Sequence, residues 1–403
     1  MKTVRVNASR TYDICIARGL LQTAGPQIAA VHSPCTCMLV SDETVFALYG
    51  ETVANSLQRA GFTVHTFVIA PGESSKNTAT LVSLWETLAE KQLTRSDLLV
   101  ALGGGVVGDL TGFAAATFLR GIEYVQIPTT LLAMVDSSVG GKTAVDLAHG
   151  KNLAGAFCQP SLVLCDPDAL HTLTPDIFAD GMAEVIKYGF INHPALLQHL
   201  HEEHDIADII TLCVEDKRNI VEQDEHDNGC RQLLNLGHTL AHGIELHSGY
   251  TISHGSAVAV GMVLITKAAV KADLCTAETL DVLLGLLQKY DLPTETQFTC
   301  EQLCTAALED KKRKGGFITL VIPTATGASE LKKLAVEELP AFLAKAWENI
   351  TGPSPLPSLP TRRWGAWPVT WTLNASGRRW PTPWTGTIWA TTRTRPSTPP
   401  TPR

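Results

Sequence analysis

The stretch Leu98-Leu-Val-Ala-Leu-Gly-Gly-Gly-Val-Val-Gly-Asp109 joins a short apolar run to a glycine-rich turn, and an apolar stretch follows it as far as Leu119. Gly103, Gly105 and Gly108 have the spacing G-x-G-x-x-G. With a strand before the turn and a helix after it, this spacing is typical of a dinucleotide site. The turn therefore predicts an α/β fold in which a helix N-terminus faces a pyrophosphate. A tight strand-to-helix turn without a ligand is the alternative.

Short apolar runs alternate with helical stretches on both sides of this turn, up to about residue 166. Strands are expected at residues 37–40, 63–70, 98–102, 124–127 and 162–165, each followed by turn or cap residues, as in a parallel sheet. From Pro175 onward the apolar period is helical, with helices expected at residues 177–190, 196–225, 231–247 and 255–290. We therefore expect a Rossmann-like α/β domain at residues 1–172 and a mostly α-helical domain at residues 173–350.

The last part of the chain, residues 351–403, differs in composition from the rest. From residue 352 onward it contains no Asp, Glu or Lys, but eleven of the 22 prolines and six of the 8 tryptophans. Proline at that density opposes regular structure, so we expect a disordered tail without a function of its own. A peptide-binding or membrane-contacting role is the alternative, although no periodic amphipathic face supports it.

Composition limits the classes of partner. The formal net charge of -8 argues against a nucleic-acid-binding surface. No leader-like segment opens the chain and no apolar run is long enough to cross a bilayer, so no membrane partner is expected. The 10 cysteines lack the paired spacing of zinc fingers and suit a reducing compartment. Together these features predict a cytoplasmic protein.

Residues 231–254 contain four of the 13 histidines, set among small and apolar residues. Histidine is the commonest metal ligand and the usual proton shuttle near neutral pH. His238 and His242 are four residues apart, so a helix would place both on one face, and this spacing alone nominates them as a metal pair. His254 precedes Gly255 at an expected helix start, where capping is the alternative role. For each histidine taken singly, a core position is the alternative.

Two further segments carry candidate binding residues. Residues 136–152 include Lys142 and Lys151 among glycines and hydroxyl side chains, which suits an oxyanion cradle; a lysine-bearing surface turn is the alternative. A P-loop is excluded because Asp136 occupies the position of its first glycine. Glu184 and Lys187 are three residues apart on an expected helix. They are either a surface ion pair or a metal-ligating carboxylate beside a substrate-binding lysine.

Taken together, these segments resemble the 3-dehydroquinate synthase family over residues 1–345. The resemblance rests on GGGVVGD at 103–109, PTTLLAMVDSSVGGKTAVD at 128–146, GKNLAGAF at 150–157, AEVIKYG at 183–189, RQLLNLGHT at 231–239, His254-Gly255 and Asp310-Lys311-Lys312. It implies a shikimate-pathway enzyme that converts the phosphorylated sugar acid 3-deoxy-D-arabino-heptulosonate 7-phosphate to 3-dehydroquinate and phosphate. A related sugar-phosphate cyclase or a glycerol dehydrogenase-like polyol dehydrogenase is the alternative, and a non-catalytic binding protein is a third.

The resemblance also implies two cofactors and a homodimer. NAD would oxidise a substrate hydroxyl and return its hydride after phosphate elimination, before ring opening and aldol closure. A divalent metal, zinc or alternatively cobalt, would polarise the reacting oxygens. Its ligands would be Glu184, His238 and His254. This set replaces the pair chosen from spacing and leaves His242 for proton transfer.

The remaining implied site residues form two groups. The residues expected around NAD are Asp42, Glu73, Lys76, Gly104, Gly105, Asp109, Thr129, Thr130, Asp136, Lys142, Lys151 and Thr172. The residues expected around the substrate, besides His242, are Arg120, Lys142, Asn152, Lys187, Lys217, Arg231, Asn235 and one of Lys311 or Lys312. Such a cationic pocket in an acidic protein suits a substrate that carries a phosphate and a carboxylate.

The chain departs from the family pattern next to the third implied ligand. Where the family has a glutamate after His254-Gly255, this chain has Ser256. If that glutamate accepts a hydrogen bond from the metal-binding histidine, its loss would weaken metal affinity about tenfold or more.

Overall fold

The computed structural model describes residues 1–202, 204–311, 316–348, 371–373 and 379–381. The chain divides into two compact units, Met1–Leu359 and Pro360–Arg403. In the second unit only strands β12 (Trp371–Leu373) and β13 (Arg379–Pro381) are described, and they pair antiparallel. Apart from this pair, the predicted disordered tail lies outside the described residues. The predicted domain boundary at residue 172 stays a prediction, since it falls inside the first unit.

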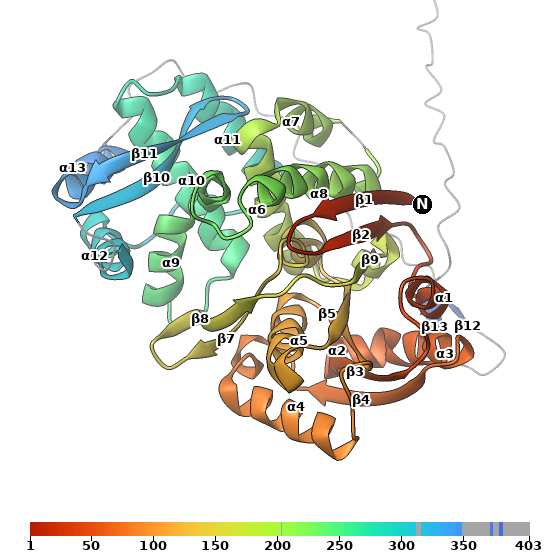
Figure 1. Ribbon diagram of the computed structural model, residues 1–403. Helices are drawn as coiled ribbons and strands as arrows, with labels where there is room; N and C mark the ends of the chain where they lie inside the picture. Colours follow the sequence, from red (N-terminus) through yellow and green to blue (C-terminus); the bar gives the residue numbers. More distant parts are fainter. Residues whose placement is uncertain (203, 312–315, 349–370, 374–378, 382–403) are drawn as a thin grey trace, which may run out of the picture. The chain divides into compact units, whose positions relative to one another are not determined.

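A seven-stranded sheet dominates the N-terminal half of the first unit, in the order β1-β2-β9-β6-β5-β3-β4 (Figure 1). All neighbouring strands are parallel except β1 and β2, which form an antiparallel edge hairpin. Its strands are β1 (Lys2–Asn7), β2 (Thr11–Ile16), β3 (Thr36–Asp42), β4 (Thr63–Ile69), β5 (Leu98–Gly103), β6 (Glu123–Pro128) and β9 (Leu162–Cys165). The five predicted strands correspond to β3, β4, β5, β6 and β9, whereas the β1–β2 hairpin was not predicted.

Strand β5 is apolar throughout because both faces of the sheet are covered there. Leu98, Val100 and Leu102 belong to one hydrophobic cluster, and Leu99 and Ala101 belong to a second. On the sheet lie helices α1 (Ala24–Ala29), α3 (Glu51–Arg59), α4 (Thr78–Glu90) and α5 (Gly105–Thr117). The Rossmann-like parallel sheet that the sequence predicts is therefore confirmed.

Beyond residue 174 the first unit is mostly helical, as predicted. Its helices are α6 (Pro175–Asn192), α7 (Pro194–His201), α8 (Ile206–Gln223), α9 (His238–His247), α10 (His254–Lys271), α11 (Ala277–Lys289), α12 (Cys300–Lys311) and α13 (Leu339–Ala344). The first unit also contains two antiparallel hairpins. The hairpin of β7 (Lys142–Leu147) and β8 (Gly150–Phe157) precedes these helices, and that of β10 (Phe317–Ala325) and β11 (Ala328–Ala335) follows α12. In the part of the chain that the structure describes, no helix combines the length and apolar character of a bilayer-crossing segment.

Three predicted helices were wrong in extent. The helix expected at 196–225 divides into α7 and α8, where Asp205 caps the second helix by accepting from the Ala207 N–H. The helix expected at 255–290 divides into α10 and α11 after Asp273 adopts a φ of 56°. The helix expected at 231–247 is a 3-10 turn, Cys230–Asn235, followed by α9. Gly237 separates these two segments at a φ of 80°, a left-handed conformation that favours glycine.

Candidate active site

The carboxyl ends of β3, β5 and β6 meet at one edge of the sheet. In register, Ser41 lies opposite Leu102 and Gly103 lies opposite Pro128, which places Asp42, Gly104 and Thr129 side by side along this edge. Open α/β sheets bind ligands outside this edge. The Thr129 N–H donates to the Gly103 carbonyl at 3.0 Å, while its buried hydroxyl has no partner among the described residues. This unpartnered hydroxyl and the first turn of α5 suit a dinucleotide.

A buried lysine lies beneath the glycine turn. Lys76 Nζ lies 2.7 Å from Glu73 Oε1, 3.3 Å from Asp109 Oδ2 and 3.9 Å from Asp146 Oδ1. Burial raises the pKa of Asp109 to about 6, although Lys76 acts in the opposite direction. The predicted cofactor residues Glu73, Lys76 and Asp109 thus form one ionic cluster, joined by Asp146, which the sequence did not nominate.

Asp42 and Thr172, both expected near NAD, make other contacts. The Val45 N–H donates to Asp42 Oδ1 at 3.0 Å, so this carboxylate caps a short helix. The Thr172 hydroxyl lies 2.7 Å from the Tyr49 hydroxyl, beyond the end of β9. Their proximity to NAD stays a prediction.

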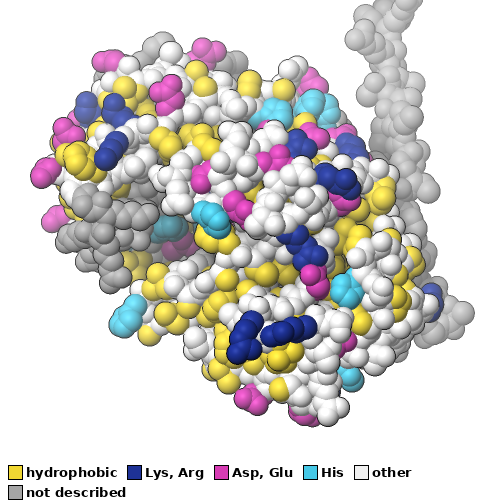
Figure 2. Space-filling view, viewed as in Figure 1, with side chains coloured by type: hydrophobic (Ala, Val, Ile, Leu, Met, Phe, Trp, Pro, Cys, Tyr) yellow, Lys and Arg dark blue, Asp and Glu magenta, His cyan; other side chains and the backbone are white. Residues whose placement is uncertain are grey.

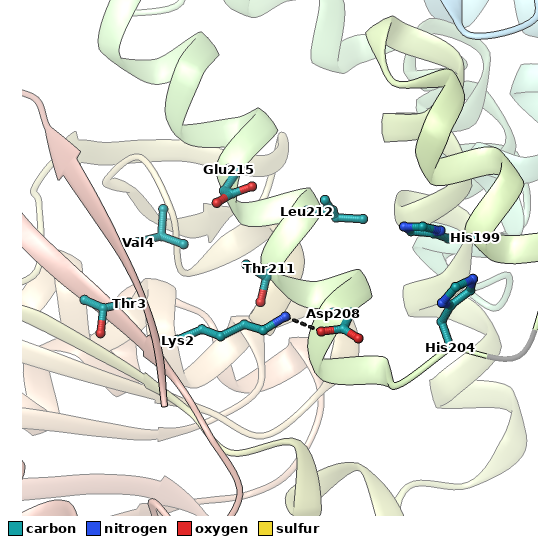
Figure 3. A pocket seen from close by; sticks show the side chains of 9 residues that line it. All are labelled: Lys2, Thr3, Val4, His199, His204, Asp208, Thr211, Leu212 and Glu215. Atoms are coloured by element: carbon teal, nitrogen blue, oxygen red, sulfur yellow. Dashed lines mark hydrogen bonds and ion pairs between the residues drawn. The ribbon is translucent and has the colours of Figure 1, made fainter.

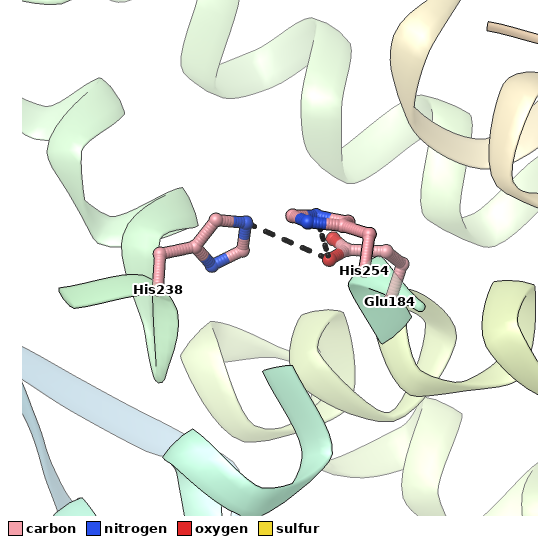
Figure 4. A group of neighbouring side chains, drawn as sticks. All are labelled: Glu184, His238 and His254. Carbon is pink, nitrogen blue, oxygen red and sulfur yellow. Dashed lines mark ion pairs between the residues drawn. The ribbon is translucent and has the colours of Figure 1, made fainter. Parts of the chain in front are cut away.

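Glu184 on α6, His238 on α9 and His254 on α10 converge on one point (Figure 4). Each offers one ligand atom, and these atoms lie within 4.8 Å of one another. Glu184 Oε1 is 3.7 Å from His238 Nε2 and 3.6 Å from His254 Nε2. Two ligands about 2 Å from one tetrahedral ion lie about 3.3 Å apart, so this spacing fits a small divalent ion better than it fits direct hydrogen bonds.

Close helix packing at two glycines brings these three residues together. A Cβ at Gly255 would lie 2.1 Å from the Asp180 carbonyl, so only glycine lets the start of α10 approach α6. A Cβ at Gly261 would lie 2.2 Å from the Gly237 carbonyl, so α10 also lies against the turn before His238. Helix α10 therefore sets its own His254 beside ligands from α6 and α9.

The electrostatics of the three residues favour a cation. Burial raises the pKa of Glu184, but the Lys187 ammonium and His254 outweigh it and hold that pKa at about 2. Burial and Lys187 lower the pKa of His238 to about 3, so its imidazole is neutral. His238 Nδ1 donates to the Leu236 carbonyl at 3.2 Å, leaving the Nε2 lone pair directed at Glu184. Glu184 Oε1 accepts no hydrogen bond from the described residues, so the donor set fits a divalent metal.

Three of the predicted substrate-binding cations are buried. Lys187 forms an ion pair with Glu184. Lys217 Nζ lies 2.9 Å from Asp136 Oδ1, and burial lowers the pKa of this lysine to about 8. Arg231 Nη2 donates to the Gly140 carbonyl at 2.9 Å, while the buried Arg231 Nε has no partner among the described residues. This unpartnered donor indicates a position where an anionic ligand would bind.

The β7–β8 hairpin contributes three more predicted residues. Lys142 at its start forms a 2.5 Å ion pair with Asp227. Asn152 has a φ of 57°, and its N–H donates to Asp146 Oδ1 at 2.8 Å. Lys151 Nζ donates to Glu245 Oε1 at 3.2 Å, which places this predicted NAD residue beside the histidines.

Five further predicted residues have other positions, and one of them lies outside the described residues. Arg120 is exposed and lies after α5 and just before β6, at the edge where the parallel strands begin. His242 is exposed one turn beyond His238, with ring centroids 6.0 Å apart. For Lys311 only the backbone, at the end of α12, is described, and Lys312 lies outside the described residues. Asn235, on the 3-10 turn, lines a small cavity with Gly237.

A groove lies elsewhere among the described residues, between β1 and α8 (Figure 3). It has a volume of about 460 Å³, and its lining contains none of the predicted site residues. Lys2 and Asp208 form an ion pair there, and the rings of His199 and His204 are 4.1 Å apart. On the face drawn in Figure 2, basic and acidic side chains are interspersed.

Sequence reasoning gave no role to three residues that contact the candidate site. Glu245 lies two helical turns after His238, a spacing that puts both on one face of α9 and could have revealed it. Asp146 meets Lys76 both through its carboxylate and through its N–H, which donates to the Lys76 carbonyl at 2.8 Å. The two residues are far apart in the sequence, so no local pattern reveals this contact. Asp227 lies in a loop, where no periodic signal exists.

Comparison with known proteins finds two family models that match the chain. Residues 66–180 match the family 3-dehydroquinate synthase N-terminal, and residues 181–313 match 3-dehydroquinate synthase C-terminal. The chain is 44% identical over 353 residues to 3-dehydroquinate synthase of Clostridium kluyveri, covering 85% of this chain and 98% of that one. It is likewise 44% identical over 352 residues to 3-dehydroquinate synthase of Enterococcus faecalis, with 85% and 98% covered.

Solved structures of related cyclases share the fold. The 2-epi-5-epi-valiolone synthase of Streptomyces hygroscopicus subsp. jinggangensis 5008, with NAD+ and Zn2+ bound, is 27% identical with a TM-score of 0.77, covering 85% of this chain and 99% of that one. A 2-deoxy-scyllo-inosose synthase complexed with carbaglucose-6-phosphate, NAD+ and Co2+ has a TM-score of 0.74 at 24% identity, with 85% and 99% covered. The second likeness concerns the fold alone.

Proposed function

The chain belongs to the 3-dehydroquinate synthase family, and from that premise we propose that it converts 3-deoxy-D-arabino-heptulosonate 7-phosphate to 3-dehydroquinate and phosphate. It would act as a carbon–oxygen lyase of the shikimate pathway, with NAD and one divalent metal ion, zinc or cobalt, as cofactors. A cytoplasmic homodimer is part of the same proposal.

The observation that carries the proposal is the convergence of Glu184, His238 and His254 beside the buried ammonium of Lys187. One carboxylate and two imidazoles are a common set of protein ligands for catalytic zinc, and three protein ligands leave a position open for substrate. When bound, NAD would accept and return a hydride while the metal polarises the substrate oxygens next to it.

The residues around this group would bind and orient the substrate. Arg231 has a buried, unpartnered Nε, and Lys142 reaches the same region from β7, so this pair suits an anionic group of the substrate. Lys217 pairs with Asp136 and Lys187 pairs with Glu184, and both lysines supply further buried positive charge. His242, exposed one turn after His238, would exchange protons with the substrate and solvent.

Incubation of the full chain with NAD, zinc and the phosphorylated heptulosonate tests the proposal. We expect phosphate release and dehydroquinate formation in equal amounts, with no net NADH. Absence of both products at micromolar enzyme would overturn the assignment. Net NADH formed from a simple polyol would instead indicate a polyol dehydrogenase, because a synthase returns its hydride within each cycle.

A further inference from the structure

Glu245 is a buried acid on α9 that lies behind the metal group. Its side chain is 5% exposed, and Glu245 Oε1 lies 3.6 Å from His254 Nδ1. His254 Nε2, the other ring nitrogen, lies 3.6 Å from Glu184 Oε1. The imidazole of His254 is therefore held between two carboxylates, one on the side of the metal group and one behind it.

The same oxygen of Glu245 also contacts the β7–β8 hairpin. Lys151 Nζ lies 3.2 Å from Glu245 Oε1, and this ammonium lies 4.7 Å from the centroid of the Tyr250 ring. One carboxylate on α9 thus contacts a histidine of α10 and a lysine of the hairpin that was expected near NAD.

Ser256, which replaces the family's glutamate, does not take part in this arrangement. Its N–H donates to Asp180 Oδ1 at 3.1 Å, and its hydroxyl accepts from the Ser253 hydroxyl at 2.8 Å. These contacts cap the first turn of α10 and tie it to α6. In this chain the carboxylate behind His254 comes from position 245.

We propose that Glu245 is the positioning residue that orients His254 toward the metal and ties this ligand to Lys151. This inference rests on the proposed function, since it assumes a metal at Glu184, His238 and His254. A carboxylate near Nδ1 favours the tautomer that carries its hydrogen there, which leaves the Nε2 lone pair for the metal. Removing such a partner costs about 10- to 100-fold in metal affinity.

The test measures zinc affinity by competition with a chromogenic chelator, on the full chain and without turnover. We expect Glu245→Gln to weaken zinc binding about 10- to 100-fold, with an unchanged far-UV circular dichroism spectrum. The Co2+-loaded variant should also show a shifted visible absorption spectrum, because the imidazole is no longer held in one orientation. Zinc affinity within threefold of the parent's, with an unchanged cobalt spectrum, would overturn the proposal.

Two further variants sharpen the result. Ser256→Ala is the matched control, and it should leave zinc affinity within threefold because the hydrogen bonds of Ser256 among the described residues go to Ser253 and Asp180. Glu245→Asp keeps the charge on a shorter side chain and should bind zinc with intermediate affinity. If Glu245→Gln fails to fold, Glu245→Asp decides alone: zinc affinity equal to the parent's overturns the proposal.

The outcome also separates this proposal from the proposed function. A parent chain whose zinc affinity depends on Glu245 but which forms no dehydroquinate would support the positioning role and overturn the synthase activity. An active parent chain whose Glu245→Gln variant binds zinc normally would support the synthase activity and overturn the positioning role. A parent chain that binds no zinc would overturn both.

Discussion

Lys217 Nζ donates to the backbone carbonyl of Asp136 at 2.6 Å and lies 2.9 Å from the Oδ1 of the same residue. The Tyr188 hydroxyl donates to that oxygen at 2.6 Å. Helix α8 is therefore joined to the helical segment Ala133–Ser137 that follows β6, and the buried ammonium of Lys217 is fixed there. This ammonium titrates in an experimentally accessible range.

Activity should depend on the charge of Lys217. Burial lowers the pKa of this lysine to about 8, with Asp136 acting in the opposite direction. The cation that attracts an anionic substrate is present below pH 8 and is lost above it, so kcat/KM should fall by about tenfold per pH unit on the alkaline side. The measurement is a kcat/KM profile from pH 6 to 10. Lys217→Arg cannot deprotonate in this range, so an unchanged alkaline limb in this variant would assign the titration to another group.

Metal binding should require His238 and not His242. His238→Ala removes one of three converging ligands, so zinc measured by elemental analysis after gel filtration should fall from about one per chain to near zero. His242→Ala should retain zinc and lose activity by about 10²- to 10⁴-fold, the usual contribution of a general acid or base. Equal zinc loss in both variants would instead indicate that His238 and His242 are both metal ligands, as spacing alone suggests.

Some of this could be predicted from the sequence because it is local. The apolar run of β5, its glycine turn and the alternation of strands and helices around it are encoded within windows of a few residues. The helix breaks are harder to predict. Gly237 has a φ of 80°, and a Cβ there would lie 2.8 Å from the Val258 carbonyl, so the position requires glycine because of a contact that only the folded chain contains.

The metal group could not be predicted from spacing. Glu184, His238 and His254 lie on three helices, and their convergence depends on glycine contacts between α10 and its neighbours. Residue patterns alone favoured His238 with His242, and only the family resemblance pointed to the set that the structure brings together. Glu245 was visible in sequence as an acid among histidines, but its role depends on the direction in which the His254 ring faces.

The two roles of Asp42 should be separable. Asp42 Oδ1 accepts from the Val45 N–H, so Asp42→Ala should lose about 1 kcal/mol of stability as a lost helix cap and also lose the predicted contact with NAD. Asp42→Ser keeps a capping oxygen, so it should retain the unfolding temperature. It should still weaken NAD about 10- to 100-fold, the cost of one hydrogen bond to a charged group. Fluorescence titration with NAD and thermal unfolding measure the two effects, and unchanged NAD affinity in both variants would remove Asp42 from the cofactor site.

The approach of α10 to α6 should depend on Gly255. A methyl group there would lie 2.1 Å from the Asp180 carbonyl, so Gly255→Ala must push the two helices apart. We expect a loss of about 1–3 kcal/mol in the free energy of unfolding, as in overpacked cores. Zinc affinity should fall as well, because His254 moves with its helix.

Gly285 on α11 provides the matched control for this effect. It is also a helical glycine, but a Cβ there meets nothing within 4 Å. Gly285→Ala should therefore be neutral or stabilise the protein by up to about 1 kcal/mol, since alanine is the better helix former, and it should leave zinc affinity unchanged. Urea unfolding of the metal-free proteins, followed by zinc titration, compares the pair. If both variants lose stability equally, the loss is not specific to the close contact at Asp180, and that contact does not hold the ligands together. If only Gly255→Ala loses stability and zinc together, the spacing between α6 and α10 determines the geometry of the metal group.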